Sequence, residues 1–297
     1  PVGSDEAADA ELEDEEIVPP ETLIEVDDLA VNEGLSGDWR NILLLGTDSR
    51  TAQQYSRTDT MIVLSINPAD SQVKLTSLMR DLWVDIPGHG GAKLNAACVY
   101  GGPELTVRCI NEYFDLNIQS YVLVNMQCLA AIVEMLGGIP MDVTEAEAEA
   151  INKLFDDDRN SDAEAKFVGE YVSAGTQVML DGNQALAFSR IRKQDSDYAR
   201  TERQRRVLVT IARKLQEKDL LTLAGMVTNL LPYVETNLSF DEIMAIAGTA
   251  MKADLDDLTQ LRLPVDGTYQ SGTYNGTWCI RPDFAENTRL LHEFIYG

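Results

Sequence analysis

The chain has 297 residues, of which 49 are acidic and 24 are lysine or arginine, giving a formal net charge of −25 at pH 7. This length suffices for one large domain or two small ones with a sizeable core. The negative charge excludes a general nucleic-acid binder, because that class neutralises phosphates with many basic residues. Any site for an anion must therefore be local.

The first segment, residues 1–38, contains fourteen acidic residues and no lysine or arginine. Such a composition predicts a flexible tether, although residues 22–31 hold enough apolar side chains to pack as a short strand or arm. We expect one domain over residues 39–297. No apolar run is long enough to span a membrane, and no signal-peptide pattern opens the chain.

Three strands are predicted next. Residues 41–46 form an apolar run typical of a buried central strand, and residues 61–66 and 73–79 follow with strand patterns. The turn sequence at 67–70 is short, so the second and third strands should form an antiparallel hairpin. A domain that mixes these strands with later helices is of the α/β class.

This strand order predicts where polar residues gather. If the second strand is antiparallel to both neighbours, the residues after the first and third strands meet those before the second. Ligands of open α/β sheets commonly bind beyond strand ends, where loops converge. We therefore expect one crevice lined by Asp48, Arg50, Arg57, Asp59, Arg80 and Asp81.

The later elements are mostly helical. Glycine and capping signals predict helices over 93–100, 103–114, 126–135, 182–188, 199–217, 220–230, 240–250 and 283–296. Strands are expected over 121–124, 258–263 and 274–280. The acidic stretch 144–170 is predicted to be a solvated loop around 156–162, which lacks the glycine and glutamate of a calcium-binding EF-hand.

Seven basic residues fall between Arg190 and Arg206 in this acidic chain, which indicates that an anion is held there. On the helix over 199–217, Ile211 and Leu215 form an apolar stripe with Leu208 beside it, and Gln204 and Arg200 continue this stripe at helical spacing. Polar residues on such a stripe either clash with the core or point into a site. Arg205 and Arg206 are expected to be solvated.

Cysteine and histidine contents bound the remaining chemistry. Four cysteines are compatible with two disulfides in an oxidising compartment or with four buried thiols. The chain has no C-x-x-C spacing and only two histidines, which argues against a zinc site.

Several sequence blocks occur together in an order that resembles the LytR-CpsA-Psr family, over residues 40–216. They are LGTDSR at 45–50, SRTDTM at 56–61, LMRD at 78–81, KLNAA at 93–97, LDG to SRIR over 180–192, and DYAR to RQ over 197–204. The resemblance implies a three-layer α/β/α sandwich around a mixed sheet, with an apolar tunnel for a prenyl tail.

The resemblance also implies a function. Such proteins move a glycopolymer, with one phosphate, from a polyprenyl-pyrophosphate carrier to peptidoglycan, commonly at the 6-hydroxyl of N-acetylmuramic acid, or to a surface protein. We therefore expect a Mg²⁺-dependent phosphotransferase, with Mn²⁺ as an alternative, on the outer face of the bacterial membrane. It would be a monomer held by an N-terminal transmembrane helix preceding residue 1.

By position in the family pattern, Asp48 and Asp59 are the expected metal ligands, and with Arg57 and Asp81 they form the expected catalytic set. The expected pyrophosphate-binding residues are Arg57, Arg80, Arg190, Arg192, Arg200, Arg203 and Gln204. Arginine suits phosphate oxygens, and Mg²⁺ binds one or two carboxylates plus phosphate oxygens. The extracellular setting favours two disulfides, Cys98–Cys109 and Cys128–Cys279.

Two other functions remain open. The same residues could serve a Mg²⁺-dependent hydrolase of polyprenyl-pyrophosphate lipids, with water as the acceptor. A non-catalytic binder of lipid-linked glycans is the other alternative. The Asp48/Asp59 pair argues against the binder, since binding alone does not require carboxylates beside a pyrophosphate.

Overall fold

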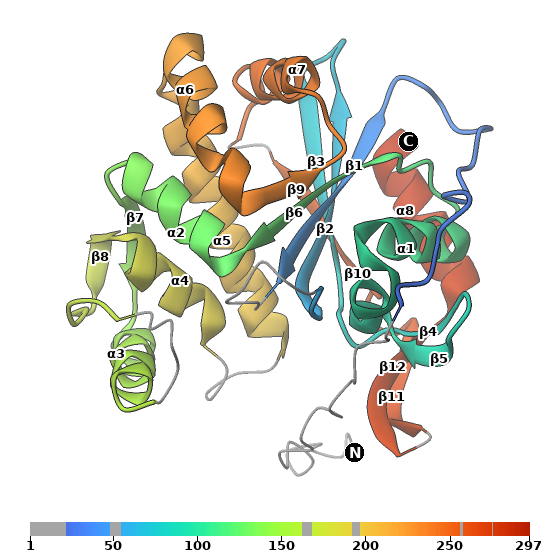
Figure 1. The fold of residues 1–297 in the computed structure, drawn as a ribbon, viewed down its shortest axis with the longest axis horizontal. Helices are drawn as coiled ribbons and strands as arrows, with labels where there is room; N and C mark the ends of the chain where they lie inside the picture. Colours follow the sequence, from blue (N-terminus) through green and yellow to red (C-terminus); the bar gives the residue numbers. More distant parts are fainter. Residues whose placement is uncertain (1–21, 48–54, 162–167, 192–196, 256–257, 275) are drawn as a thin grey trace.

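The computed structural model describes residues 22–47, 55–161, 168–191, 197–255, 258–274 and 276–297. A six-stranded mixed sheet lies at the centre, in the order β10-β3-β2-β1-β6-β9. Helices cover both of its faces, with α1 and α8 on one side and α2, α4 and α5 on the other (Figure 1). The predicted α/β class and the layered arrangement are confirmed.

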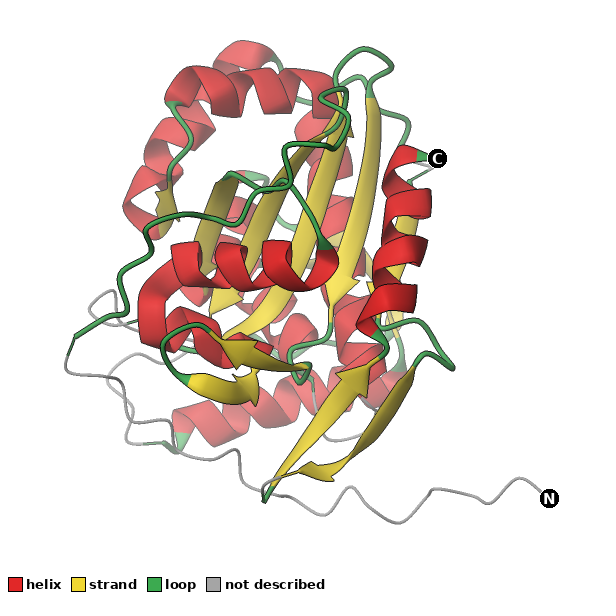
Figure 2. Cartoon of the chain, turned by 90° about the vertical axis from the view of Figure 1, so that its right-hand side faces the viewer, coloured by secondary structure: helices red, strands yellow, loops and turns green. Residues whose placement is uncertain are grey.

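The central strands are β1 (Arg40–Thr47), β2 (Thr58–Asn67), β3 (Gln72–Leu78), β6 (Ser120–Asn125), β9 (Val234–Thr236) and β10 (Thr259–Leu263). Three two-stranded ribbons surround them: β4 (Trp83–Ile86) with β5 (Gly90–Lys93), β7 (Ile139–Val143) with β8 (Gly175–Leu180), and β11 (Tyr269–Tyr274) with β12 (Thr277–Pro282). Two of these ribbons, β4–β5 and β11–β12, lie at one end of the sheet (Figure 2).

The α-helices of the described residues are α1 (Ala97–Phe114), α2 (Met126–Met135), α3 (Glu145–Arg159), α4 (Gly182–Arg190), α5 (Asp197–Gln216), α6 (Leu220–Leu230), α7 (Phe240–Ala250) and α8 (Phe284–Tyr296). Short 3₁₀ turns span Leu94–Ala96 and Leu231–Tyr233. Within the described ranges, no helix combines the length and apolar character needed to cross a bilayer.

The β1–β2–β3 arrangement gathers polar residues at one edge of the sheet. β2 is antiparallel to both β1 and β3, and its interior residues Ile62 and Val63 are almost fully buried. The start of β2 therefore lies beside the C-terminal ends of β1 and β3. This placement confirms the prediction for Asp59, Arg80 and Asp81, whereas Asp48 and Arg50 lie outside the described residues.

The acidic stretch after residue 144 is a helix for most of its length, so the predicted loop is wrong there. A capping box between Thr144 and Glu147 starts α3. Ile151 and Phe155, one helical turn apart, are fully buried against α4 and β8 residues of the same core cluster. The apolar period of this segment outweighs its acidity.

An arm formed by residues 22–34 packs along α1. The backbone N–H of Ile24 donates to the carbonyl of Tyr100 at 2.8 Å, and that of Asn32 donates to Leu116 at 2.9 Å. Asn111 on α1 fixes the middle of the arm by donating its side-chain amide to the carbonyl of Leu29 at 2.7 Å. The arm is therefore part of the packed unit, on the face of the sheet that α1 covers.

All four cysteines are buried free thiols, so the two predicted disulfides are wrong. Cys98 and Cys109 lie on the two helical segments of α1 that meet at the kink of Gly101 and Gly102. Cys128 on α2 and Cys279 on β12 lie on opposite sides of the sheet (Figure 1).

Helices α2 and α4 approach each other closely at Gly182. A Cβ atom there would lie within 3.0 Å of Cα of Ala130 and closer still to its carbonyl oxygen. The N–H of Gly182 also donates to Oε1 of Glu134 on α2 at 2.9 Å. Only a residue without a side chain permits this spacing, so the glycine fixes how near α4 lies to α2.

Candidate functional site

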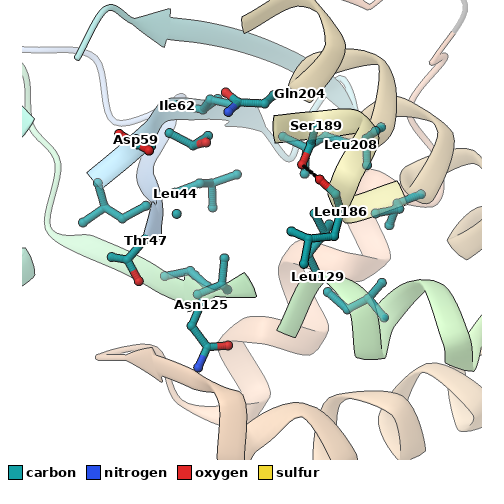
Figure 3. Close-up of a pocket in the computed structure, with 18 of the residues that line it drawn as sticks. Leu44, Thr47, Asp59, Ile62, Asn125, Leu129, Leu186, Ser189, Gln204 and Leu208 are labelled. Carbon is teal, nitrogen blue, oxygen red and sulfur yellow. Dashed lines mark hydrogen bonds between the residues drawn. The ribbon is translucent and has the colours of Figure 1, made fainter. Parts of the chain in front are cut away.

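A cavity of about 270 Å³ lies between the central sheet and helices α2, α4 and α5 (Figure 3). Its sheet side is apolar and its helix side carries mainly leucine, valine and isoleucine. The lining residues from the sheet are Leu44, Leu45, Ile62, Val122 and Val124, and those from the helices are Leu129, Ile132, Leu186, Val207, Leu208 and Ile211. Such a chamber suits an extended hydrocarbon.

Polar groups surround one end of this cavity. Asp59 and Thr47 reach it from the sheet edge, and Gln204 reaches it from α5 (Figure 3). Arg190, the last residue of α4, also lines the cavity. The site therefore joins an apolar chamber to a mouth that carries both charges.

Local sequence determines where α4 begins and which face of α5 carries Gln204. A capping box between Asp181 and Gln184 starts α4, which ends at Arg190. On α5, Gln204 and Leu208 lie one turn apart, so the apolar stripe and the polar residue face the same cavity. Gln204 thus lies where the helical spacing predicted it.

Four charged side chains of alternating sign form a chain beside the mouth. Arg80 Nη1 lies 2.7 Å from Asp59 Oδ1, and Arg80 Nε lies 3.6 Å from Asp81 Oδ2. Lys93 Nζ lies 2.8 Å from Asp81 Oδ1. The Asp81 side chain is only 5% exposed, so its burial is offset by the two cations. This arrangement holds the Arg80 guanidinium between two carboxylates.

Lys93 belongs to this row of four charged side chains, although the sequence predicted no role for it. It is the single lysine, arginine, aspartate or glutamate between Asp85 and Glu104. A lone cation in a stretch of small and apolar residues was the available signal, because a buried charge requires a partner.

The remaining arginines of the basic stretch differ in position. Arg203 is 4% exposed and donates from Nη2 to the carbonyl of Ile191 at 2.9 Å, so it lies behind the cavity wall. Arg206 pairs with Glu147 at 3.3 Å and donates to the carbonyl of Asp142 at 2.7 Å. Arg205 pairs with Glu202. The expectation of solvation is therefore wrong for Arg205, whose side chain is 11% exposed, whereas the Arg206 side chain is 35% exposed.

Three of the arginines predicted to bind pyrophosphate are not among the described residues that line the cavity. Arg57 is half-buried two residues before Asp59 and does not line the cavity. Arg192 lies outside the described residues, as does the side chain of Arg200.

The donor set at the mouth fits a magnesium ion that is completed by substrate. Mg²⁺ usually binds one or two carboxylates together with phosphate oxygens and water. Among the described acidic residues, Asp59 lines the cavity, and no cluster of three or more metal-binding side chains occurs in the described ranges. One carboxylate at the mouth of an anion site agrees with this type of shared coordination.

Comparison with known proteins identifies the family. The sequence model of the LytR_cpsA_psr family matches residues 6–288. Two relatives are named polyisoprenyl-teichoic acid–peptidoglycan teichoic acid transferase TagU. The one from Oceanobacillus iheyensis is 34% identical over 247 residues, covering 80% of this chain and 69% of that protein. The one from Enterococcus faecalis is 36% identical over 260 residues, covering 85% and 78%.

A solved structure agrees with this result. TagT bound to LIIa-WTA superposes with a TM-score of 0.68 at 25% identity, covering 92% of this chain and 95% of that one. The sequence blocks, the sheet and the cavity are thus accompanied by a match along almost the whole length. The chain belongs to the LytR-CpsA-Psr family.

Proposed function

We propose that this protein transfers a glycopolymer with its phosphate from a polyprenyl-pyrophosphate carrier to peptidoglycan, at the outer face of the bacterial membrane. The observation that carries the proposal is the apolar cavity with a mouth containing Arg190, Asp59 and Gln204. The names of the TagU relatives describe a polyisoprenyl-linked donor, a teichoic acid and a peptidoglycan acceptor.

The cavity accounts for the lipid part of the donor. A prenyl chain is a long hydrocarbon, and burying each methylene-sized group contributes ~0.8 kcal/mol. The side chains facing it from β1, β2, β6 and three helices are almost all aliphatic. A polar small molecule would lose hydration there without gaining hydrogen bonds, which argues against a water-soluble cofactor as the occupant.

The mouth accounts for the pyrophosphate. Arginine binds phosphate oxygens through its planar fork, and Arg190 and Arg80 lie at the edge where the tail would emerge. We assign Arg57, Arg192 and Arg200 to the same anion from the family pattern. The Asp59 carboxylate holds Arg80 in position, and a bound phosphate would replace that carboxylate as its partner.

The transfer is a displacement at the phosphorus that bears the glycan. The acceptor hydroxyl oxygen forms a bond to that phosphorus, the bond to the bridging oxygen breaks, and polyprenyl phosphate leaves. We assign Asp59 to accepting the hydroxyl proton once a bound phosphate has replaced it as the partner of Arg80, and we assign the arginines to stabilising charge on the leaving oxygen. Mg²⁺, held by Asp48 and Asp59 with substrate oxygens, would supply further charge neutralisation when bound.

Asp81 has an orienting role in this proposal. Its carboxylate is buried and pairs with both Arg80 and Lys93. We therefore assign it to directing the Arg80 guanidinium toward the mouth.

The test is incubation with a lipid-pyrophosphate-linked glycan, Mg²⁺ and a peptidoglycan oligomer, followed by mass spectrometry. A covalent adduct of glycan and phosphate on the oligomer is the expected product. Free glycan phosphate without an adduct would indicate a hydrolase instead, and unchanged lipid would indicate a binder. The 6-hydroxyl of N-acetylmuramic acid is the expected attachment atom, which fragmentation of the adduct would identify.

A further inference from the structure

Two aromatic side chains meet beside the Arg80–Asp81 segment without joining the core. Trp83 on β4 and Tyr274 on β11 form an edge-to-face pair, with ring centroids 5.3 Å apart and planes at 76°. The guanidinium carbon of Arg281 on β12 lies 4.7 Å from the Tyr274 ring centre. We name Trp83, Tyr274 and Arg281 the aromatic platform.

The platform differs from other aromatic residues of the same ribbon. Tyr269 and Trp278 pack against the buried core, whereas Trp83 and Tyr274 belong to none of the core clusters of the described chain. Tyr274 is 39% exposed. Trp83 is half-buried. Tryptophan, tyrosine and arginine are the residue types most enriched among those that carry binding energy at interfaces.

The platform is held in place before any ligand binds. The Trp83 ring lies against the backbone of Gly91 on β5, where an added Cβ atom would be 2.9 Å from ring atom Cζ2. The contact with Tyr274 then joins the β4–β5 and β11–β12 ribbons. A surface that is already ordered loses little conformational entropy on binding.

Arg281 adds a positive charge to this surface. It forms no ion pair with a carboxylate of the described residues, in a chain whose net charge is −25. Its side chain is exposed and stacks on Tyr274. The platform therefore offers aromatic surface together with a cation for an acidic group of a ligand.

The platform is attached directly to the charged chain of the site. Trp83 is paired in register with Lys93, whose ammonium contacts the Asp81 carboxylate. The N–H of Ile280, next to Arg281, donates to the carbonyl of Asp81 at 2.9 Å. Both ribbons lie at the end of the sheet that carries Asp59 and Arg80, on the side away from α4 (Figure 1).

We propose that the aromatic platform binds the acceptor glycan strand, an acidic polymer of N-acetylated sugars. This inference rests on the proposed transfer. In displacements at phosphorus, the entering and leaving oxygens lie roughly in line. The leaving polyprenyl phosphate occupies the cavity side of Asp59 and Arg80, so the acceptor enters from the opposite side, where the platform lies.

Sugar chemistry fits this surface. One face of a pyranose ring presents C–H groups that carry slight positive charge, which complements the negative face of an aromatic ring. Its hydroxyl and acetamido groups can reach Gln270, an exposed polar residue on the same face of the outer strand β11 as Tyr274. Carboxylates of the acceptor would pair with Arg281. A hydrocarbon ligand would leave this arginine and this glutamine without partners.

The direct test is calorimetric titration of the whole protein with a lipid-free peptidoglycan tetrasaccharide. We expect Tyr274→Ala and Arg281→Ala each to weaken binding about tenfold, since stacking and charge-assisted contacts contribute at this level. Tyr274→Phe should retain binding because the ring remains. Tyr233→Ala is the matched control, because Tyr233 is also 39% exposed but lies on the turn after α6.

Transfer assays add a readout that a purely structural role would not produce. Tyr274→Ala should raise the acceptor KM about tenfold and leave the donor KM and kcat unchanged. Wild-type acceptor binding by Tyr274→Ala and Arg281→Ala would overturn the proposal, as would a loss confined to donor binding. Should Tyr274→Ala unfold, Arg281→Ala decides alone, since its side chain is on the surface.

The titration also separates this inference from the transfer itself. If the wild-type protein attaches no glycan to peptidoglycan, the proposed function fails. Binding of the tetrasaccharide that depends on Tyr274 would then still support the platform. A wild-type protein that does not bind the tetrasaccharide, while still transferring glycan to polymeric peptidoglycan, would disprove the platform and leave the transfer intact.

Discussion

Nη1 of Arg80 lies 2.7 Å from Oδ1 of Asp59. Asp59 lies at the start of β2, and Arg80 lies two residues after the end of β3, its antiparallel neighbour. Their side chains are only 14% and 18% exposed. The pair places a cation and a carboxylate at the mouth of the apolar cavity. In the proposed reaction, a bound phosphate would compete with Asp59 for Arg80.

Replacing Arg80 should therefore abolish transfer without unfolding the protein. We expect Arg80→Ala to lower kcat by about 100-fold to 1000-fold, since one lost donor to a developing oxyanion has effects of this size. Arg80→Lys should recover part of the activity, because lysine retains the charge but not the fork. The measurement is the initial transfer rate, with the melting temperature recorded for each variant.

Arg159→Ala is a suitable control for this experiment. Arg159 pairs with Asp156 on the exposed last turn of α3 and does not line the cavity. Its removal should change the rate less than twofold, because exposed ion pairs contribute at most about 1 kcal/mol to stability. A wild-type rate in Arg80→Ala would remove this arginine from the site.

Filling the cavity should discriminate between lipids by tail length. Leu208→Trp adds bulk to the α5 wall, opposite the sheet residues of the cavity. Excluding one five-carbon prenyl unit from burial costs roughly 3–4 kcal/mol, which exceeds a hundredfold in affinity. We expect the variant to bind long-chain prenyl pyrophosphates much more weakly and a short water-soluble analogue almost normally.

The matched variant is Leu221→Trp, since Leu221 is 84% exposed on α6 and lies outside the cavity lining. Equal affinities of Leu208→Trp for short and long tails would show that the prenyl chain binds elsewhere.

Arg203 should prove to be a structural residue. It is buried and holds the carbonyl of Ile191, the residue that follows Arg190 at the end of α4. Arg203→Met removes a charged hydrogen bond worth about 1.5–3 kcal/mol and leaves that carbonyl without its partner. We expect a lower free energy of unfolding in urea titrations, and a rate loss that a stabilising osmolyte partly restores. Full stability with a complete loss of pyrophosphate binding would instead make Arg203 a direct ligand.

The buried thiols give a prediction for pH. Burial raises the pKa of Cys98, Cys109 and Cys128 to about 12. Unfolded cysteine has a pKa of about 8.5. Above about that pH the unfolded chain loses protons that the folded chain keeps, so the free energy of unfolding falls as pH rises toward 12. Urea titrations at pH 7 and pH 10 should show the decrease, and Cys109→Ala should reduce it.

Alkylation tests the same thiols independently. Native protein at pH 8 should react slowly with iodoacetamide, because these groups stay protonated and buried. The unfolded protein should take up four alkyl groups without any reductant, as intact mass would record. If the unfolded protein took up no alkyl groups before reduction, the result would show that the four cysteines form disulfides.

Magnesium removal should stop transfer reversibly. We expect a chelator to abolish the adduct and added Mg²⁺ to restore it, because the anion and Asp59 repel each other without a cation between them. Calorimetry of Mg²⁺ with inorganic pyrophosphate present should detect binding that Asp59→Asn weakens. Unchanged transfer in excess chelator would show that the arginines alone balance the charge.

Local patterns predicted the parts of the fold that depend on neighbouring residues. The apolar runs over 41–79 specified three strands and their antiparallel order, and that order alone brought Asp59 to Arg80. The helix stripe likewise located Gln204 at the cavity. In each case a short sequence period or turn determines the direction of a strand or of a helix face, and that direction determines which side chains meet.

Other features depend on contacts between distant segments. Trp83 meets Tyr274 because two ribbons pack side by side, and no local pattern encodes that contact. An even number of cysteines suggested disulfides, but the number of cysteines does not give the distances between them, and all four are buried free thiols. In α3, the many acidic residues obscure the helical spacing of Ile151 and Phe155, which are buried by contacts with other segments.

The contact of Gly182 with Ala130 determines the distance between two walls of the apolar cavity. Because α4 and α2 form adjacent walls, any side chain at 182 would move one wall outward and loosen the grip on the tail. If the cavity holds the prenyl tail as proposed, the cross-section available to the tail is fixed by a residue that does not line the cavity.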